Sequence, residues 1–277
     1  GDTKVVEEPR WYLSDKGTFK FDKCVVSQAH LKLFEELLNN ARDNYIRYPN
    51  ESPIYKIGVS IDYSTNEISI INNGKAISNI TFGESRKLVN KPLRKTEEQY
   101  RDSYCSVVLF GSLYSSSNYR DSYGGTNSKN GIGAYICNIF ASKFNVETAD
   151  GNTLLSTSYS KGKLLNIKKP IKCAKKYTKI SYIIDPKEFG ASDLSNTFDI
   201  MARRSIEVAA YIGAELSLNL TGLDVPFSKL YKTKAKRTLF ALYESCFKPI
   251  IYETEGASIA FFKKDEDQIN FDMNICN

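Results

Sequence analysis

A carboxylate and two amides stand at helical spacing early in the chain. Glu36, Asn40 and Asn44 follow one another at intervals of four residues, so on a helix they share one face about one turn apart. A carboxylate can orient and deprotonate a water molecule that attacks a phosphate. An amide oxygen is a neutral ligand for Mg²⁺. Such pairs are also common on solvated helix faces, so this segment alone does not define a site.

Two glycine-containing segments can complete such a site. Asn72-Asn73-Gly74 ends an expected strand, where glycine lets the backbone approach a flat ligand and the Asn72 amide can read the edge of a base. An Asn-Gly pair more often closes a hairpin, however. Asn130-Gly131-Ile132-Gly133 precedes an expected helix, whose free N–H groups and positive dipole end attract phosphates. The chain has neither a P-loop lysine motif nor a dinucleotide-binding glycine motif.

The hydrophobic pattern predicts the elements that must position these residues. We expect a helix over about residues 28–45, capped by Ser27, and a helix over about 193–212 that ends at Gly213. Residues 1–27 read as an irregular arm with short extended pieces at 11–13 and 19–21. Strands are expected over 57–61, 68–71, 144–148, 153–159, 163–167, 178–184 and 216–220. A helix followed by strands with inserted helices indicates a layered α+β fold.

Composition limits the classes of function. The chain has 277 residues, 42% of them hydrophobic, and a net charge of +6, which is compatible with DNA nearby but is weak evidence for it. No apolar run is long enough to span a bilayer, so no membrane partner is expected. Six cysteines show no metal-ligand spacing and His30 is the only histidine. Reduced thiols are therefore expected, and a zinc site or a Ser-His-Asp triad is improbable.

The order of these motifs resembles the Bergerat (GHKL) ATPase fold, and more closely the ATPase domain of eukaryotic-type DNA topoisomerase II. The segments that carry the resemblance are residues 33–44, 68–75, 109–119 and 130–149. The resemblance implies an α+β fold: a two-layer α/β sandwich followed by a partial transducer-like domain that is similar to ribosomal protein S5. It also implies the boundaries, with an N-terminal arm at 1–27, the GHKL ATPase-like domain at 28–213 and the transducer-like part at 214–277.

The same resemblance implies roles for individual residues. Glu36 corresponds to the general base and Asn40 to the Mg²⁺ ligand. Asn72 and Thr178 would lie near the adenine. The positions implied to contact the nucleotide are Asn40, Asn44, Asn72, Gly74, Ser116, Ser117, Asn118, Asn130, Gly131, Ile132, Gly133 and Thr178.

The function that this resemblance implies is the N-terminal ATP gate of a type IIA DNA topoisomerase. ATP and Mg²⁺ would be the cofactors, and ATP binding and hydrolysis would drive homodimerisation and DNA strand passage. The chain would meet DNA through the full-length enzyme, in the nucleus or in another DNA-associated compartment. We expect an ATP-hydrolysing domain without a DNA-cleavage domain in this chain.

Several positions depart from the family pattern. Ala76 stands where the family has a second glycine beside the adenine, Ser78 replaces a proline, and Tyr135 stands where eukaryotic members have a lysine that faces the γ-phosphate. The phosphate loop is lengthened by residues 126–129, and the Gln-Thr-Lys triplet of the transducer is missing. The alternative is therefore a pseudo-ATPase that serves as an interaction or scaffold module in chromosome biology. A repair or chaperone relative fits these motifs less well.

Overall fold

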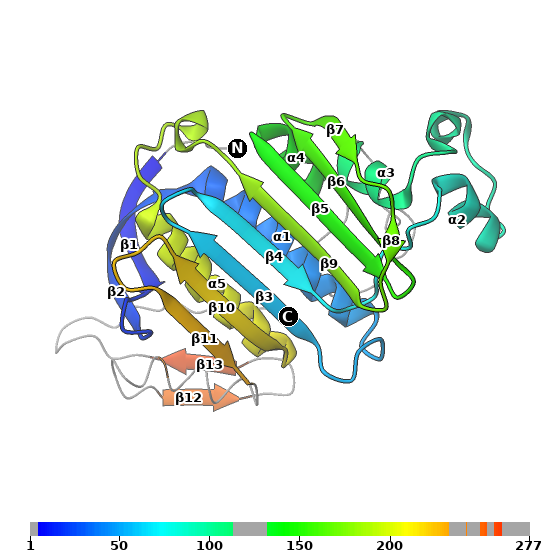
Figure 1. Cartoon of the computed structure of the whole chain (residues 1–277). Coiled ribbons are helices and arrows are strands. Elements are labelled where there is room, and N and C mark those ends of the chain that lie inside the picture. Colours follow the sequence, from blue (N-terminus) through cyan, green and yellow to red (C-terminus); the bar gives the residue numbers. More distant parts are fainter. Residues whose placement is uncertain (1–4, 113–131, 233–241, 243–249, 254–257, 262–277) are drawn as a thin grey trace.

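One mixed β-sheet of nine strands organises the molecule (Figure 1). The computed structural model describes residues 5–112, 132–232 and 242, with the backbone of 250–253 and 258–261. The strands follow the order β11 (Phe227–Tyr231), β10 (Glu215–Thr221), β3 (Lys56–Asp62), β4 (Glu67–Asn72), β9 (Lys176–Ile183), β5 (Lys143–Asp150), β6 (Thr153–Ser160) and β7 (Lys163–Ile167), and β8 (Ile171–Lys172) also pairs with β6. Neighbouring strands run antiparallel, except that β10 and β3 are parallel.

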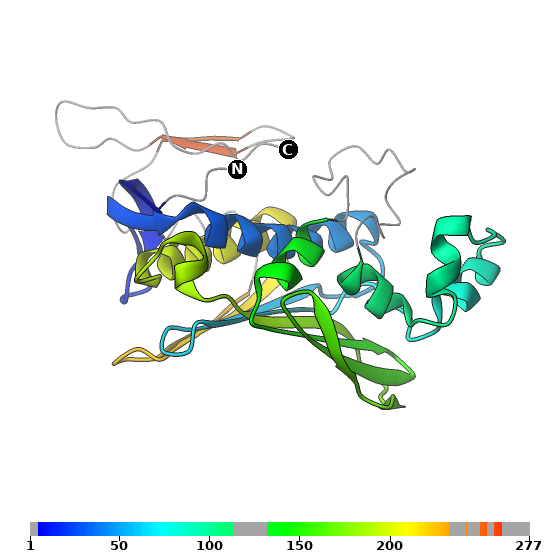
Figure 2. The same ribbon diagram turned by 90° about the horizontal axis from the view of Figure 1, so that it is seen from above.

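Helices cover one face of this sheet (Figure 2). They are α1 (Gln28–Arg47), α4 (Gly133–Phe140) and α5 (Ser195–Ile212). The apolar stripe expected on the first helix is buried at Leu31, Phe34, Leu38 and Ala41. The short elements α2 (Phe82–Leu88), η1 (Lys95–Tyr100) and α3 (Cys105–Gly111) follow β4, and η3 (Pro186–Phe189) precedes α5. The fold class expected from the sequence is confirmed.

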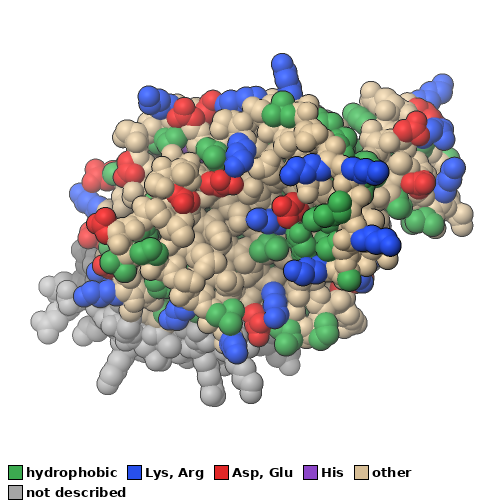
Figure 3. Space-filling view, viewed as in Figure 1, with side chains coloured by type: hydrophobic (Ala, Val, Ile, Leu, Met, Phe, Trp, Pro, Cys, Tyr) green, Lys and Arg blue, Asp and Glu red, His purple; other side chains and the backbone are tan. Residues whose placement is uncertain are grey.

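Among the described residues, no helix lies on the opposite face of the sheet. The central band of this face consists largely of uncharged polar side chains and backbone (Figure 3). Strand register aligns Asn219, Ser60, Ser69, Ser181 and Asn145 in one row across β10, β3, β4, β9 and β5. Alternate residues along these strands point to opposite faces. A polar outer row and a buried apolar inner row are what a two-layer fold requires.

The N-terminal segment is a β-hairpin, which corrects the expected irregular arm. β1 (Val5–Leu13) and β2 (Phe19–Ser27) pair along their whole length and pack against α5. Leu13, Phe19 and Val26 are buried, so the hairpin is part of the hydrophobic core. Charged residues between the apolar positions obscured this pattern in the sequence.

The expected domain boundary at residue 213 does not separate two units of structure. β10 pairs with β3 in register from Glu215 to Thr221, and β11 extends the same sheet. Leu216, Leu218 and Leu220 are buried, so this segment completes the first core. Beyond it, β12 (Ile250–Glu253) and β13 (Ser258–Phe261) form a separate two-stranded sheet, and the transducer-like assignment of that part stays a prediction.

His30 and four of the six cysteines lie in the described part of the chain. Ser27 precedes α1 as expected, but its hydroxyl contacts His30 Nδ1 at 2.7 Å and caps no backbone N–H group. Burial lowers the pKa of His30 to about 4. Cys24, Cys105, Cys137 and Cys173 are free thiols. Within the described ranges there is no cluster of metal-ligating side chains and no helix long and apolar enough to cross a membrane.

Candidate functional site

A cavity of about 440 Å³ opens between α1, the end of β4 and β9. Its volume lies in the range of small-molecule sites. Four of the residues expected at a nucleotide site line it, namely Asn40, Asn44, Asn72 and Thr178. The wall between them is mainly apolar and includes Leu37, Ala41, Ile70, Ala76, Ile77, Leu109, Phe110, Ala134 and Ile180. A concave apolar wall with a few polar groups can hold a flat ring and orient it.

The polar face of α1 contributes side chains to the cavity wall. Asn40 lines the cavity and makes no hydrogen bond to any residue in the described part of the chain. Glu36 lies one turn earlier and is not among the described residues that line the cavity. Its Oε1 atom is 3.1 Å from Lys32 Nζ. The amide of Asn40 is therefore free to take a ligand, with a carboxylate one turn away.

Asn44 holds the turn after β4 in place. Its Nδ2 donates to the Lys75 carbonyl at 2.9 Å, and its Oδ1 accepts from the Lys75 N–H at 2.9 Å. Both polar atoms of the amide are thus bound to one backbone residue. The sequence predicts that Asn44 lies near a nucleotide. Asn44 lines the cavity, and its amide also holds the backbone of the cavity wall.

Gly74 is required by this arrangement. A Cβ atom on Gly74 would overlap Asn44 Oδ1 and come within 2.7 Å of Tyr55 Cε2. The Gly74 N–H also donates to Asn72 Oδ1 at 3.2 Å. Tyr55 is itself fixed, because its hydroxyl donates to the Ala41 carbonyl at 2.5 Å. The Asn-Gly pair therefore closes a turn that packs on α1, and neither of its two residues is among those that line the cavity.

The deep end of the cavity gathers polar groups from three elements. Asn72 and Thr178 are cross-strand neighbours on β4 and β9. Asp43 of α1 also lines the cavity, is only 2% exposed and pairs with Arg42 at 2.8 Å. Sequence reasoning missed Asp43, although it follows Asn40 by three residues and so shares its helix face. Together these groups can recognise the hydrogen-bonding edge of a ring.

The other end of the site lies at the start of α4. Ile132 precedes this helix and Gly133 begins it. A Cβ atom on Gly133 would stand 2.7 Å from Glu36 Oε2 and 2.8 Å from its Cβ, so this glycine and the carboxylate are in contact. Tyr135 lies half-buried in the first turn of α4. Five further expected ligands lie outside the described residues, namely Ser116, Ser117, Asn118, Asn130 and Gly131.

Comparison with known proteins gives this geometry a family. Over 214 residues the chain is 33% identical to DNA topoisomerase 2 of Candida albicans. The matched segment covers 74% of this chain and 13% of that relative. The ATPase and transducer domains of Balamuthia mandrillaris DNA topoisomerase II superpose with a TM-score of 0.69 at 27% identity, over 95% of this chain and 65% of that one. The chain belongs to the GHKL ATPase-domain family of DNA topoisomerase II.

The topoisomerase II fold extends over nearly all of the chain. The ATPase region of Saccharomyces cerevisiae topoisomerase II superposes with a TM-score of 0.76, covering 96% of this chain and 66% of that one at 23% identity. No model of a protein family matches the sequence. The chain spans about an eighth of the length of the topoisomerase II relatives that it matches.

Two of the departures from the topoisomerase II pattern lie in the cavity wall. Ala76 and Ser78 both line it, in the loop that follows β4. Ala76, at the position where the resemblance implies a second glycine, is therefore part of the cavity wall. The cavity remains about 440 Å³ in volume with the Ala76 methyl group in place.

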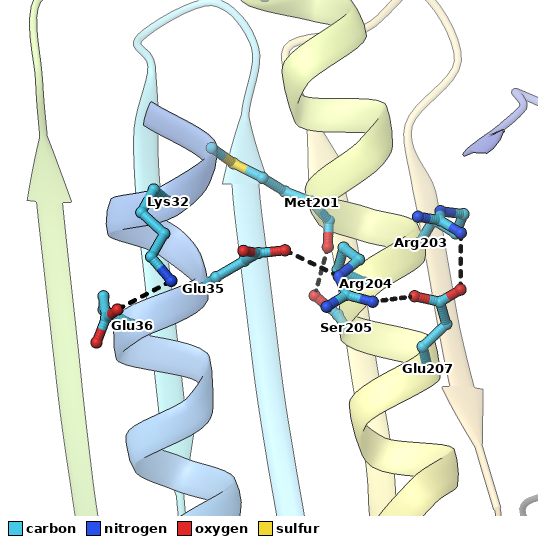
Figure 4. A network of polar contacts seen from close by, with 8 residues as sticks. All are labelled: Lys32, Glu35, Glu36, Met201, Arg203, Arg204, Ser205 and Glu207. Carbon is cyan, nitrogen blue, oxygen red and sulfur yellow. Dashed lines mark hydrogen bonds and ion pairs between the residues drawn. The ribbon is translucent and has the colours of Figure 1, made fainter. Parts of the chain in front are cut away.

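A partly buried ionic network joins α1 to α5 in this topoisomerase II domain (Figure 4). Arg204 donates to Glu35 at 2.9 Å and to Glu207 at 2.8 Å, and Arg203 donates to Glu207 at 2.7 Å. Although burial opposes it, the carboxylates of Glu207 and Glu35 raise the pKa of Arg204. Because Glu35 is the neighbour of Glu36, this network sets the rotation of the helix turn that carries the candidate base.

Proposed function

We propose that this chain binds Mg-ATP in the cavity beside α1 and hydrolyses it as the ATP gate of a type IIA DNA topoisomerase. The observation that supports this most directly is the contact between Glu36 and Gly133 at one end of the site, with Asn72 and Thr178 at the other. The adenine would occupy the deep end near Asn72 and Thr178. The phosphates would extend past Asn40 toward the start of α4, where helix N–H groups favour anions.

Hydrolysis requires a base beside the terminal phosphate. The oxygen of a water molecule would attack the γ-phosphorus, and the bond from that phosphorus to the bridging oxygen of the β-phosphate would break. ADP leaves with the electron pair of that bond, the products are ADP and phosphate, and the Glu36 carboxylate takes the proton of the water. Asn40 holds the phosphate chain at the position where the Glu36 carboxylate can act on the attacking water.

The residues present fit one Mg²⁺ ion. Asn40 offers an unengaged amide oxygen at the cavity wall, and Mg²⁺ commonly takes one or two protein oxygens and fills its remaining positions with water and phosphate oxygens. When bound there, Mg²⁺ would neutralise charge on the phosphate oxygens. Asn40 would hold it, and the Asn44–Lys75 contact would keep the neighbouring wall in place.

The wider roles follow from the family. We propose that nucleotide binding promotes homodimerisation and that the chain acts on DNA as part of a longer enzyme in the nucleus. Family membership and the spacing of the site residues support this function. The chain by itself is the nucleotide-binding part of that cycle.

The test separates binding from turnover. Calorimetric titration of the protein with ATP and with a non-hydrolysable analogue, with and without Mg²⁺, should show micromolar binding that depends on Mg²⁺. Glu36→Gln should keep binding and lose ATP turnover by at least about a hundredfold, as expected for removal of a general base. The matched control Glu98→Gln changes an exposed glutamate on η1 and should leave turnover unchanged. Absence of binding at millimolar nucleotide would refute the proposal.

A further inference from the structure

Lys32 forms an ion pair with Glu36, the candidate base. Its Nζ atom is 3.1 Å from Glu36 Oε1, and the two side chains come from successive turns of α1 (Figure 4). The Lys32 side chain is 66% exposed and that of Glu36 is 33% exposed. Lys32, Glu36 and Asn40 therefore place an ammonium group, a carboxylate and an amide one turn apart along the helix.

Helix stability does not account for this pair. A glutamate that precedes a lysine by four residues stabilises a helix better than the reverse order, and here the lysine comes first. Lys32 also lies near the N-terminal end of α1, where a cation opposes the helix dipole and where the first turn has no acidic residue. Exposed pairs of this kind contribute only about 0.3–0.5 kcal/mol.

The two oxygens of the Glu36 carboxylate have different neighbours. Oε1 faces Lys32, whereas Oε2 lies against Gly133 at the start of α4. On the other side of the same helix turn, Arg204 holds Glu35 at 2.9 Å. With the backbone fixed by Arg204, the remaining freedom of the carboxylate is rotation about its own side-chain bonds. Among the described residues, Lys32 restrains this rotation through its ion pair with Glu36.

We infer that Lys32 is a positioning residue for Glu36: by holding Oε1, it turns Oε2 toward the start of α4, where the attacking water and the terminal phosphate would meet. This inference rests on the proposed function and adds to it the residue that orients the base. Lys32 itself acts through Glu36. Its contribution is the orientation of the carboxylate, a geometric factor that can change rates by up to about a hundredfold for a misplacement of 1 Å.

The test compares variants that keep or remove the ammonium group. Lys32→Met should lower kcat for ATP hydrolysis about tenfold, because Glu36 loses its fixed orientation. The KM for ATP should change less than about twofold, since the lost interaction acts on the transition state. Lys32→Arg keeps a cation within reach and should recover most of the rate. In a Glu36→Gln background, Lys32→Met should cause no further loss.

Control variants distinguish a failure of the positioning role of Lys32 from a failure of the proposed ATPase function. Lys23→Met, an exposed lysine on β2, should leave kcat unchanged, and thermal melting should show that every variant is folded. If the wild-type protein turns ATP over and Lys32→Met stays within twofold of it, the positioning role is overturned and the proposed function stands. If Lys32→Met adds its full effect in the Glu36→Gln background, Lys32 acts by another route. If the wild-type protein has no turnover, both the proposed function and the role of Lys32 are overturned.

Discussion

Gly133 and Glu36 are in contact across the junction between α4 and α1, and there is no room for a methyl group between them. A Cβ atom on Gly133 would stand 2.7 Å from Glu36 Oε2 and 3.0 Å from its Cγ. Glycine at this position is therefore explained by the side chain of another helix. Its backbone is helical, so a need for unusual dihedral angles is not the reason.

Gly133→Ala should displace the Glu36 side chain. We expect ATP turnover to fall at least about tenfold, since small displacements of a catalytic group have large effects on rate, and the free energy of unfolding to fall by about 1–3 kcal/mol from overpacking. Steady-state kinetics and urea denaturation measure the two effects. Gly111→Ala is the control, because a Cβ atom there would meet nothing closer than 3.4 Å. Equal behaviour of the two variants would contradict this explanation.

Asn44→Asp should weaken the turn that forms the cavity wall. The Asn44 amide donates to the Lys75 carbonyl and accepts from the Lys75 N–H. A carboxylate would set an oxygen against that carbonyl, with an expected loss of about 1–3 kcal/mol in the free energy of unfolding and weaker nucleotide binding. Asn39→Asp makes the same change on the same helix and should have a smaller effect. If Asn44→Asp and Asn39→Asp have equal melting temperatures, the hydrogen bonds between Asn44 and the Lys75 backbone do not stabilise this turn.

Ala76→Gly should enlarge the cavity beside the expected adenine. Ala76 lines the cavity, and one methyl group in a packed site can cost about 1 kcal/mol or more. We therefore expect ATP to bind about fivefold more tightly to the variant, as measured by calorimetry. Unchanged or weaker binding would show that the base does not reach this methyl group.

Asp199→Asn should change how stability depends on pH. Burial raises the pKa of Asp199 to about 6, although the hydrogen bond from the Tyr63 hydroxyl at 2.8 Å opposes the shift. A carboxyl whose pKa is raised on folding contributes stability below its unfolded pKa, near 4, and that contribution is lost as the pH rises through about 6.

The asparagine variant has no ionisable group at this position. Its free energy of unfolding, relative to wild type, should therefore increase by roughly 2 kcal/mol between pH 4 and pH 7.5. Urea denaturation across this range measures the difference. Both proteins carry His30, so the effect of its lowered pKa cancels. Parallel stability curves for the two proteins would rule out a raised pKa for Asp199.

Periodicity and local signals were enough to predict the central strands of the sheet and the helices that cover it. The alternation in β3 and β4 and the apolar stripe of α1 place each strand and helix within a few residues of the observed bounds. Gly213 ends α5 in a left-handed conformation, with φ at 70°, as its place in the sequence indicated. The N-terminal hairpin was missed because the core positions of β1 and β2 are separated by charged residues, and its stability depends on packing against α5.

The sequence by itself determined the helix face that carries Glu36 and Asn40, because helical spacing is a local property. It also determined the order of the motifs that indicate the family. Only the tertiary structure showed that Asn44 binds the backbone of Lys75, that Gly133 packs on Glu36, and that β10 joins the first sheet. These relationships join residues far apart in the chain, and their geometry depends on how helices and strands pack in three dimensions.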